Sequence, residues 1–430
     1  MTASSFVSMA EKIIKPHSPT PFSLKRYNLC LTDEIMVPVY MPIVAFYPNP
    51  SKTPEQVSNL LQNSLSKLLS SYYPFAGTLG SDNASFVDCN DRGAKFIQVR
   101  YDCPMSEIVN LPDTGPEYLP FAKGTPWSST PDEQSLLLVQ LSHFNCGGLA
   151  VSVRLSHKIA DGCTLANFIS DWASIARDDN ANIPSPQLIG SSIFPPFTEM
   201  PSTGIHTDTN VDYEFYNLPV CKKRYLFSNS KLEMLKTQVE SETGVQNPTR
   251  IEVLSALIYK CAVTAARANS SSFKPSSLSL PVNLRPMLNP PLETRTIGNI
   301  ISFIKVDTTS EDEMTMGRVA REIRKGKDEL KQEGDVKKEK LVSLWSEWIH
   351  SIELYRSSSV CNYPLNNLDF GWGKPNRVTI PVFGVANTCM FMDNLSGDGI
   401  EVIIVLPEKD VTQFENSKEL LQFASPVTNL

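Results

Sequence analysis

The stretch Val151-Ser-Val-Arg-Leu-Ser-His157-Lys-Ile-Ala-Asp161-Gly162 carries the pattern from which the fold is best understood. It predicts a strand that ends on a histidine, a tight turn with an acid and a glycine, and a helix that starts at Cys163. This layout exposes an imidazole at a strand end, with a carboxylate four residues on. Because the unperturbed pKa of histidine lies nearest neutrality, His157 is a candidate for taking up and returning a proton. In isolation, the same stretch is also compatible with a histidine in an ordinary turn.

A second motif lies far downstream, at Asp369-Phe370-Gly371-Trp372-Gly373, and Lys374-Pro375 follow it. Two glycines flank a tryptophan beside a phenylalanine and an aspartate. Glycine permits backbone conformations that are closed to other residues and lets neighbouring chains approach closely. By itself, the motif predicts a tight turn whose aromatic side chains fill a core.

Length and composition favour two globular domains. A chain of 430 residues is too long for one ordinary core, and 41% hydrophobic with 20% charged residues is typical of globular proteins. The net charge of -7 and the lack of a long basic run argue against a nucleic-acid partner. An anionic ligand would therefore need a local basic pocket rather than a basic surface.

The nine cysteines predict reduced thiols rather than disulfides or a metal site. Their number is odd, no pair has the CxxC spacing, and several lie in apolar runs. The first residues lack the long apolar core of a signal peptide, and no run of about 18 apolar residues could span a membrane. We therefore expect a cytoplasmic protein without a bound metal or a membrane partner.

Apolar spacing predicts the main elements along the chain. Strands are expected at 38–47, 136–141 and 149–155, and helices at 55–72, 165–175, 230–242 and 249–268. A His-Phe-Asn-Cys-Gly-Gly turn should join the second and third strands, and Tyr73-Pro-Phe-Ala-Gly77 should end the first helix. The charged stretch 311–340 predicts a solvated helical face.

Residues 178–220 differ in composition from the segments around them, since Pro, Ser, Asn, Thr and Asp dominate there. A structureless stretch of this length is uncommon inside one compact domain. The sequence therefore predicts an N-terminal half at 1–190, a crossover linker at 178–220 and a C-terminal half at 221–430.

Together, HKIADG near one third of the chain and DFGWGKP in its last seventh resemble the plant BAHD acyltransferases. These enzymes move an acyl group from coenzyme A to an alcohol or amine. The resemblance covers essentially the whole chain and includes Tyr73-Pro-Phe-Ala-Gly77, Val282-Asn-Leu-Arg285 and Ser396-Gly-Asp-Gly399. It implies an α/β fold with mixed sheets and two chloramphenicol-acetyltransferase-like domains, with the active site in a tunnel between them. Acyl-CoA would be a co-substrate, and no cofactor would be bound permanently.

The resemblance also assigns roles to the residues of the motifs. His157 would be the catalytic base that takes the hydroxyl proton of the acceptor, which then attacks acyl-CoA directly in a ternary complex. Asp161 would turn away from the imidazole and pair with Arg285, and so hold the loop that aims His157. The second motif would support the site structurally through Asp369, Gly371, Trp372 and Gly373.

Four residues are expected to contact coenzyme A by the same resemblance. They are Thr249, Arg250 and Ser255 at the start of one helix, and Lys374 after the paired glycines. Thr249 also suits the N-cap position, where Glu252 would complete a capping box. The structural and the binding interpretation of this helix start are compatible.

Two side chains near His157 carry nucleophilic atoms. Ser156 adjoins His157 but points to the opposite face of a strand, so a Ser-His pair is not expected. Cys163 is more typical of a small packing residue than of a nucleophile. The sequence therefore predicts no acyl-enzyme.

Within the family, Lys15-Pro-His-Ser-Pro-Thr-Pro21 and Phe46-Tyr-Pro-Asn-Pro50 resemble the branch of alkaloid acetyltransferases and acylsugar acyltransferases. We expect a monomeric O-acyltransferase of plant specialised metabolism, with a sugar ester as acceptor ahead of an alkaloid alcohol. Thr78 stands where many relatives carry an arginine. A CoA-ligand-binding protein without turnover and a hydrolase remain as alternatives.

Overall fold

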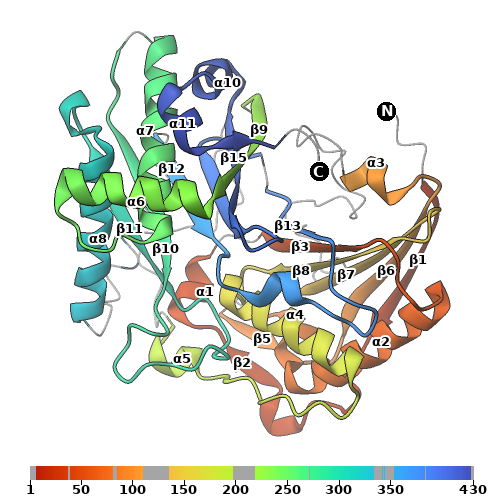
Figure 1. The fold of residues 1–430 in the computed structure, drawn as a ribbon. Helices are drawn as coiled ribbons and strands as arrows, with labels where there is room; N and C mark the ends of the chain where they lie inside the picture. The colour runs from red at the N-terminus through yellow and green to blue at the C-terminus, as the bar shows by residue number, and fades with distance from the viewer. Residues whose placement is uncertain are drawn as a thin grey trace.

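Two mixed β-sheets form the framework of the protein in the computed structural model (Figure 1). The structure describes residues 6–36, 39–80, 85–109, 135–196, 218–270, 272–333, 341, 343, 353–382 and 384–427. Each sheet combines parallel and antiparallel strand pairs and is covered by helices. The predicted α/β class with mixed sheets is therefore confirmed.

The first sheet has six strands in the order β1-β6-β7-β8-β3-β13. Their bounds are β1 Phe6–Ile14, β6 Ala94–Tyr101, β7 Leu137–Phe144, β8 Leu149–Ser156, β3 Tyr40–Tyr47 and β13 Arg377–Thr379. All eight residues of β8 are buried, and the strand lies between β7 and β3 inside the sheet. The strand that leads to His157 is thus held by two complete hydrogen-bond ladders.

Helices α2 (Pro54–Ser71) and α4 (Gly162–Arg177) pack against each other on one side of this sheet (Figure 1). Helix α2 starts with a capping box between Thr53 and Gln56, and Pro54 occupies the first turn, where its missing N–H costs nothing. It ends at the short 3-10 helix Tyr73–Ala76, where the sequence predicts a break. The apolar face of α2 is buried in the core of the first sheet.

Strand β7 is longer than the sequence predicts. The expected turn begins at His143, but the ladder with β8 continues through this residue, which lies opposite Leu149. The reversal is confined to the residues after Phe144, since Phe144 and Gly148 share a hydrogen bond of 3.0 Å and Gly147 adopts φ +85°. A glycine in this conformation allows a tighter turn than the polar composition indicates.

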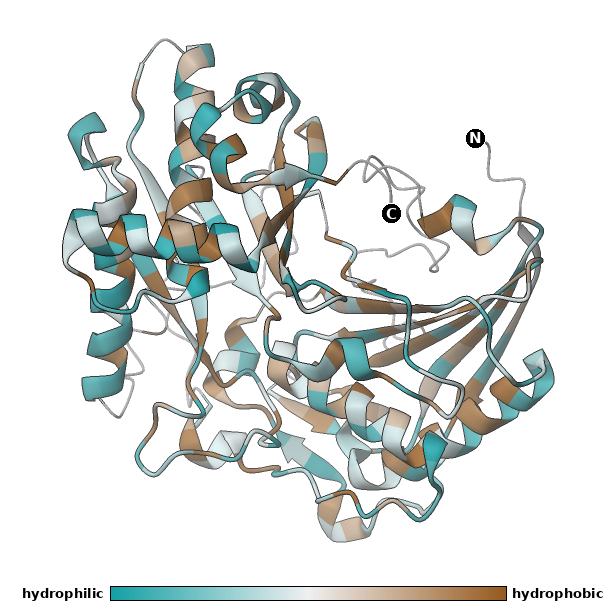
Figure 2. Cartoon of the chain, viewed as in Figure 1, coloured by the Kyte–Doolittle hydropathy of each residue, from teal (hydrophilic) through white to brown (hydrophobic). Residues whose placement is uncertain are grey.

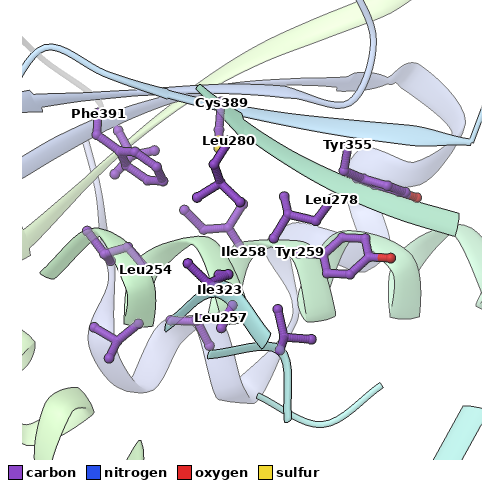
Figure 3. Close-up of a cluster of buried hydrophobic side chains, with 14 of the residues drawn as sticks. Leu254, Leu257, Ile258, Tyr259, Leu278, Leu280, Ile323, Tyr355, Cys389 and Phe391 are labelled. Carbon is purple, nitrogen blue, oxygen red and sulfur yellow. The ribbon is translucent and has the colours of Figure 1, made fainter. Parts of the chain in front are cut away.

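The second sheet has seven strands in the order β11-β10-β12-β14-β15-β9-β16. Their bounds are β11 Ile301–Thr308, β10 Ser276–Asn283, β12 Leu354–Ser359, β14 Thr388–Asp393, β15 Gly399–Pro407, β9 Val220–Ser228 and β16 Ser425–Pro426. Helices α6 Asn229–Thr243, α7 Arg250–Ser270, α8 Met316–Glu333, α10 Glu408–Glu415 and α11 Lys418–Phe423 accompany it. Figure 3 shows how α7 fills the core under this sheet, where Leu254, Leu257 and Ile258 face Leu280 and Phe391.

Helix α8 accounts for most of the described part of the charged stretch 311–340. Its polar residues give it a mostly hydrophilic surface (Figure 2). Its inner face is nevertheless apolar, with Val319, Ile323 and Leu330 buried in the core of the second sheet. The predicted solvated face is therefore one side of an amphipathic helix.

The remaining elements are short. A three-stranded sheet joins β2 Arg26–Asn28, β5 Phe86–Asp88 and β4 Thr78–Leu79, and short helices lie at α1 Leu31–Ile35, α3 Met105–Val109 and α5 Gly190–Ile193. Helix α5 belongs to the predicted linker, of which residues 197–217 lie outside the described residues. Within the described parts of the chain, no helix combines the length and apolar character that a membrane crossing requires.

One segment of the second half returns to the first sheet. Strand β13 pairs with β3 and forms an edge of this sheet, and Arg377 lies opposite Phe46. Glu401 of β15 forms ion pairs with Arg377 and with Arg224 of β9, so charged groups join this added strand to the second sheet. The two sheets are therefore linked by shared structure as well as by the chain connection.

Candidate active site

His157 directly follows β8 and is held by backbone contacts from two directions. Its N–H donates to the carbonyl of Val39 at 2.8 Å, and its carbonyl accepts from Nδ2 of Asn299 at 2.6 Å. Val39 precedes β3 in the first sheet, whereas Asn299 precedes β11 in the second. His157 thus lies where the two halves of the molecule meet.

The surroundings of His157 keep its imidazole neutral. Burial lowers the pKa of His157 below its usual value, and its own backbone carbonyl, Asp161 and Asn299 offset this only in part. The residue retains some accessible surface, while its Nδ1 is buried. A neutral imidazole that keeps accessible surface can accept a proton from a group that reaches it.

Asp161 and Arg285 form a bidentate ion pair behind the histidine. The two guanidinium N–H groups of Arg285 donate to Asp161 Oδ2 at 2.6 Å and Oδ1 at 3.2 Å. Arg285 is 0% exposed and Asp161 3%. Asp161 is also the N-cap of α4, where Oδ1 accepts from the N–H of Thr164 at 2.8 Å. The carboxylate is therefore engaged by Arg285 and by the first turn of α4.

Further contacts bind the segment between β10 and β11 to α4. Arg285 donates to the carbonyls of Thr296 and Gly298, and Thr164 Oγ1 donates to Gly298 at 3.2 Å. A second ion pair joins Arg295 of this segment to Asp171, which is 1% exposed. These contacts fix the segment before β11, and with it the position of Asn299 beside His157.

The DFGWG segment forms a compact turn. Asp369 Oδ1 accepts from the N–H groups of Gly371 at 2.8 Å and Gly373 at 3.0 Å. The two glycines have φ values of +99° and +102°, which side chains other than hydrogen strongly disfavour. Phe370 and Trp372 stack with ring centroids 5.6 Å apart, and both rings meet Tyr47 edge-on.

The contact with Tyr47 places this turn away from His157. Tyr47 lies opposite Leu149, at the start of β8, whereas His157 follows the end of the same strand. An eight-residue strand is about 26 Å long at about 3.3 Å per residue. The indole N–H of Trp372 is buried and has no hydrogen-bond partner among the described residues, but it lies too far along the strand to stabilise charge at the imidazole.

The expected coenzyme A contacts lie in different surroundings. Thr249 and Glu252 form the predicted capping box, with hydrogen bonds of 2.7 and 3.3 Å. Arg250 is partly exposed and binds Asp393 and Asn362 at 3.2 Å each. Two further residues complete this set: Ser255 is 0% exposed on α7, and the exposed Lys374 donates to Asn367 at 2.8 Å.

The side chains with nucleophilic atoms near His157 are engaged elsewhere. Cys163 is 4% exposed, its thiol donates to the carbonyl of Thr294, and burial raises the pKa of this thiol. Ser156 is fully buried and accepts from the N–H of Lys158. All nine cysteines are free thiols, and the described residues contain no cluster of three or more side chains suited to hold a metal ion.

Asn299, Arg295 and Asp33 are site residues that the sequence interpretation missed. Asn299 is 142 positions from His157, in a segment without apolar periodicity. Asp33 lies in a five-residue helix, which is too short to give a periodic signal. No local pattern therefore connects these residues with the histidine.

Comparison with known proteins identifies the class of molecule that this fold and site define. The sequence model of the Transferase family matches residues 6–421. Acylsugar acyltransferase 3 of Solanum lycopersicum is 41% identical, with 99% of each chain covered. The crystal structure of vinorine synthase superimposes with a TM-score of 0.81 at 30% identity, covering 97% of this chain and 99% of that one. The chain is an acyltransferase and belongs to the BAHD family.

A more distant structure shares the fold. The TRI101 protein of F. graminearum, complexed with coenzyme A and deoxynivalenol, gives a TM-score of 0.75 at 17% identity, covering 93% of this chain and 99% of that one. Together with the vinorine synthase structure, this match confirms the predicted two-domain architecture.

The ion pair leads to a prediction about coupling. Asp161→Ala and Arg285→Ala should each destabilise the protein by about 3 kcal/mol, because each leaves an uncompensated buried charge. The double variant should be no less stable and no less active than the worse single variant. Denaturant unfolding and initial rates of all three variants measure this.

The exposed pair Lys260–Glu419 provides the control, since both side chains keep about 30% of their surface exposed. Its coupling should stay within about 1 kcal/mol. Additive losses for Asp161 and Arg285 would contradict their action as one unit.

Proposed function

We propose that this chain transfers an acyl group from acyl-CoA to a hydroxyl group of a plant specialised metabolite, with His157 as general base. The observation that carries the proposal is the neutral imidazole at the end of β8, held by backbone contacts from both halves. Because the ring is neutral and keeps accessible surface, it is ready to accept a proton at physiological pH.

The proposed reaction proceeds by direct attack. His157 removes the proton of the acceptor hydroxyl, and the oxygen forms a bond to the thioester carbonyl carbon. The tetrahedral intermediate then collapses, the C–S bond breaks, and the imidazolium returns its proton to the leaving thiolate of coenzyme A. The products are an ester and free coenzyme A, and the enzyme is regenerated without change.

Several observations support a route without an acyl-enzyme. The Cys163 thiol donates to the Thr294 carbonyl, and its raised pKa keeps it protonated. A protonated thiol is a poor nucleophile. Ser156 lies buried within the sheet, and no contact joins its hydroxyl to the imidazole. Both substrates would therefore occupy the site together, in a tunnel between the two halves.

Coenzyme A as the donor carrier is supported by the coenzyme A complex of the TRI101 protein, which shares the fold. For this chain we propose the start of α7, at Thr249 and Arg250, as part of the coenzyme A site. Helix starts attract phosphate groups through their free N–H groups. We propose that Ser255 and Lys374 contribute as well, although Ser255 would need a shift of its neighbours to reach a ligand, because it is fully buried.

For the acceptor, we favour a sugar ester over an alkaloid alcohol. The tomato acylsugar acyltransferase, at 41% identity, supports the first choice, and vinorine synthase of Rauvolfia serpentina, at 32%, supports the second. We further propose that the protein is a cytoplasmic monomer without a permanent cofactor. Its N-terminal half would span residues 1–190 and its C-terminal half residues 221–430, with a crossover linker at 178–220. A CoA-ligand-binding protein without turnover and a hydrolase are the alternatives.

A screen of acceptors tests the activity. Purified protein is incubated with acyl-CoAs of different chain length and either sucrose esters or alkaloid alcohols, and products are identified by mass spectrometry. We expect an ester to form with a sucrose ester and little free acid without an acceptor. Release of free acid without an acceptor would instead favour a hydrolase, and binding without any product would favour the ligand-binding alternative.

His157→Ala should lower kcat by about 10²- to 10⁴-fold while the melting temperature stays near that of the wild type, because the general base alone is lost. His143→Ala is the matched control, since His143 also lies in the first sheet but belongs to β7. Activity of His157→Ala within a fewfold of the wild type would overturn the assignment.

The wild-type pH profile gives a second test of His157. Because its pKa is lowered, the base stays unprotonated below the usual histidine range, and the acid limb of kcat/KM should have its midpoint below about 6.5. A midpoint well above this value would contradict a buried neutral base.

The kinetic order distinguishes direct attack from a covalent route. Initial-rate plots at several acceptor concentrations should intersect, and enzyme denatured after incubation with acyl-CoA alone should carry no added acyl mass. Parallel lines with a stoichiometric adduct would indicate a ping-pong mechanism, and Cys163→Ser would then be the first variant to test.

A further inference from the structure

The side-chain amide of Asn299 has a defined orientation beside His157. Its Nδ2 donates to Asp33 Oδ1 at 2.8 Å and to the backbone carbonyl of His157 at 2.6 Å. Both N–H groups of the amide are thus directed at oxygen acceptors. The opposite orientation would place the amide oxygen against these two oxygens, so the carbonyl Oδ1 must lie on the other side.

Asp33 fixes the orientation of the Asn299 side-chain amide, because its carboxylate only accepts hydrogen bonds. It is 0% exposed, and its carboxylate also accepts the backbone N–H groups of Asn299 at 2.7 Å and of Cys30 at 2.9 Å. Burial raises the pKa of Asp33, while these hydrogen bonds oppose the rise. Every one of these partners is a donor, so Asp33 acts as an acceptor throughout.

A buried cation lies close to this acid. Lys158 follows His157 directly, is 4% exposed, and donates from Nζ to the carbonyl of Glu34 at 2.7 Å. Burial lowers the pKa of Lys158 to about 8, and the nearby Asp33 and Glu34 oppose this. Lys158 therefore ties α1, which contains Asp33, to the turn that contains His157.

Two buried atoms in this arrangement have no partner among the described residues: Nδ1 of His157 and Oδ1 of Asn299. They belong to residues that already share the hydrogen bond from Asn299 Nδ2 to the His157 carbonyl. The backbone carbonyl of His157, the Asn299 side chain and the backbone of Ala160 all favour the protonated imidazole. A buried acceptor without a donor is costly, and an Nδ1–H group is the donor that would satisfy it.

We propose that Asp33 and Asn299 are positioning residues for His157. Asp33 orients the amide of Asn299, the amide oxygen accepts the Nδ1 proton, and the lone pair of the imidazole is thereby placed on Nε2. This rests on the proposed role of His157 as general base. The Nδ1 proton stays with Asn299 during the reaction, and only Nε2 takes up and returns the proton of the acceptor hydroxyl.

The two acids of the site, Asp161 and Asp33, have different structural roles. Asp161 binds Arg285 and caps α4, which fixes the loop. Asp33 reaches the imidazole through Asn299 and selects its tautomer. A neutral histidine without such a partner distributes its proton over both nitrogens, and the form with the proton on Nε2 cannot act as the base.

The tautomer of His157 is measurable in the resting enzyme by ¹⁵N NMR at a pH where the ring is neutral. The chain has five histidines, so comparison with His157→Gln assigns the signals. We expect the wild type to carry the proton on Nδ1. A wild-type His157 protonated on Nε2 would overturn the proposal, whatever the activity of any variant.

Two substitutions extend the test. In Asp33→Asn, the new amide offers an N–H where Asn299 requires an acceptor, so Asn299 should rotate, and the proton of His157 should move to Nε2. In Asn299→Ser, the carbonyl partner is lost and the tautomers should mix. We expect kcat to fall about 10²-fold or more in Asp33→Asn, where the active tautomer is lost. In Asn299→Ser kcat should fall only severalfold, because mixed tautomers leave part of the enzyme active, and KM for acyl-CoA should change less than about twofold in both variants.

Asn167→Ala is the matched control. Asn167 also binds the segment before β11, donating to the Thr294 carbonyl at 2.7 Å, but has no hydrogen bond to His157 or Asp33. It should keep both the tautomer and the kcat of the wild type. Unchanged tautomer and kcat in folded Asn299→Ser would overturn the proposal, even if Asp33→Asn failed to fold.

The same measurements separate this proposal from the proposed function. An active His157→Ala variant would refute the general base but leave the tautomer measurement valid. An inactive His157→Ala variant with an unchanged tautomer in Asn299→Ser would keep the base and refute the positioning role.

Discussion

Arg285 carries its positive charge where water does not reach, and Asp161 supplies the balancing negative charge. A buried pair of this kind is weak evidence for stability but strongly fixes geometry, because separating the charges in the interior is costly. Arg285 comes from the second half and Asp161 from the first, so the pair sets how the halves meet. The turn after His157 and the segment before β11 both take their position from it.

The same constraint determines the surroundings of His157, the proposed base. Both halves pack against the turn that contains His157. The Nδ1 atom of His157 is therefore buried, and burial lowers the pKa of the imidazole. The burial that favours a neutral imidazole also leaves the ring dependent on its few polar neighbours. Asn299 is one of those neighbours, and Asp33 in turn binds its side chain. The position of the turn and the protonation of His157 thus both depend on the buried ion pair.

The DFGWG turn lies far along the sheet from His157, although it is one of the two most recognisable motifs of the chain. Its aspartate is satisfied by two backbone N–H groups, its glycines adopt positive φ angles, and its aromatic rings pack on Tyr47. Strand β13 then joins the edge of the first sheet. The motif therefore secures the return of the second half to the first sheet, which agrees with the packing role that its composition indicates.

The sequence by itself determined the features that depend on neighbouring residues. Apolar spacing located α2, α4, α7 and β8. The polar stretch after residue 178 predicted a linker. His157 was identifiable because a strand, a turn and a helix follow one another within a few residues. Asp161 and Arg285 were connected only through the resemblance to a family, since nothing local relates residues 124 positions apart.

Tertiary structure decided what depends on contacts between distant segments. The partnership of Asp33, Asn299 and His157 exists only because α1 and the segment before β11 meet at the end of β8. Likewise, β13 joins the first sheet although its residues belong to the second half of the chain. Short helices and irregular segments have no hydrophobic periodicity in the sequence. Their positions follow from the need to pair buried charges and hydrogen-bonding groups, and the partners meet only in the folded chain.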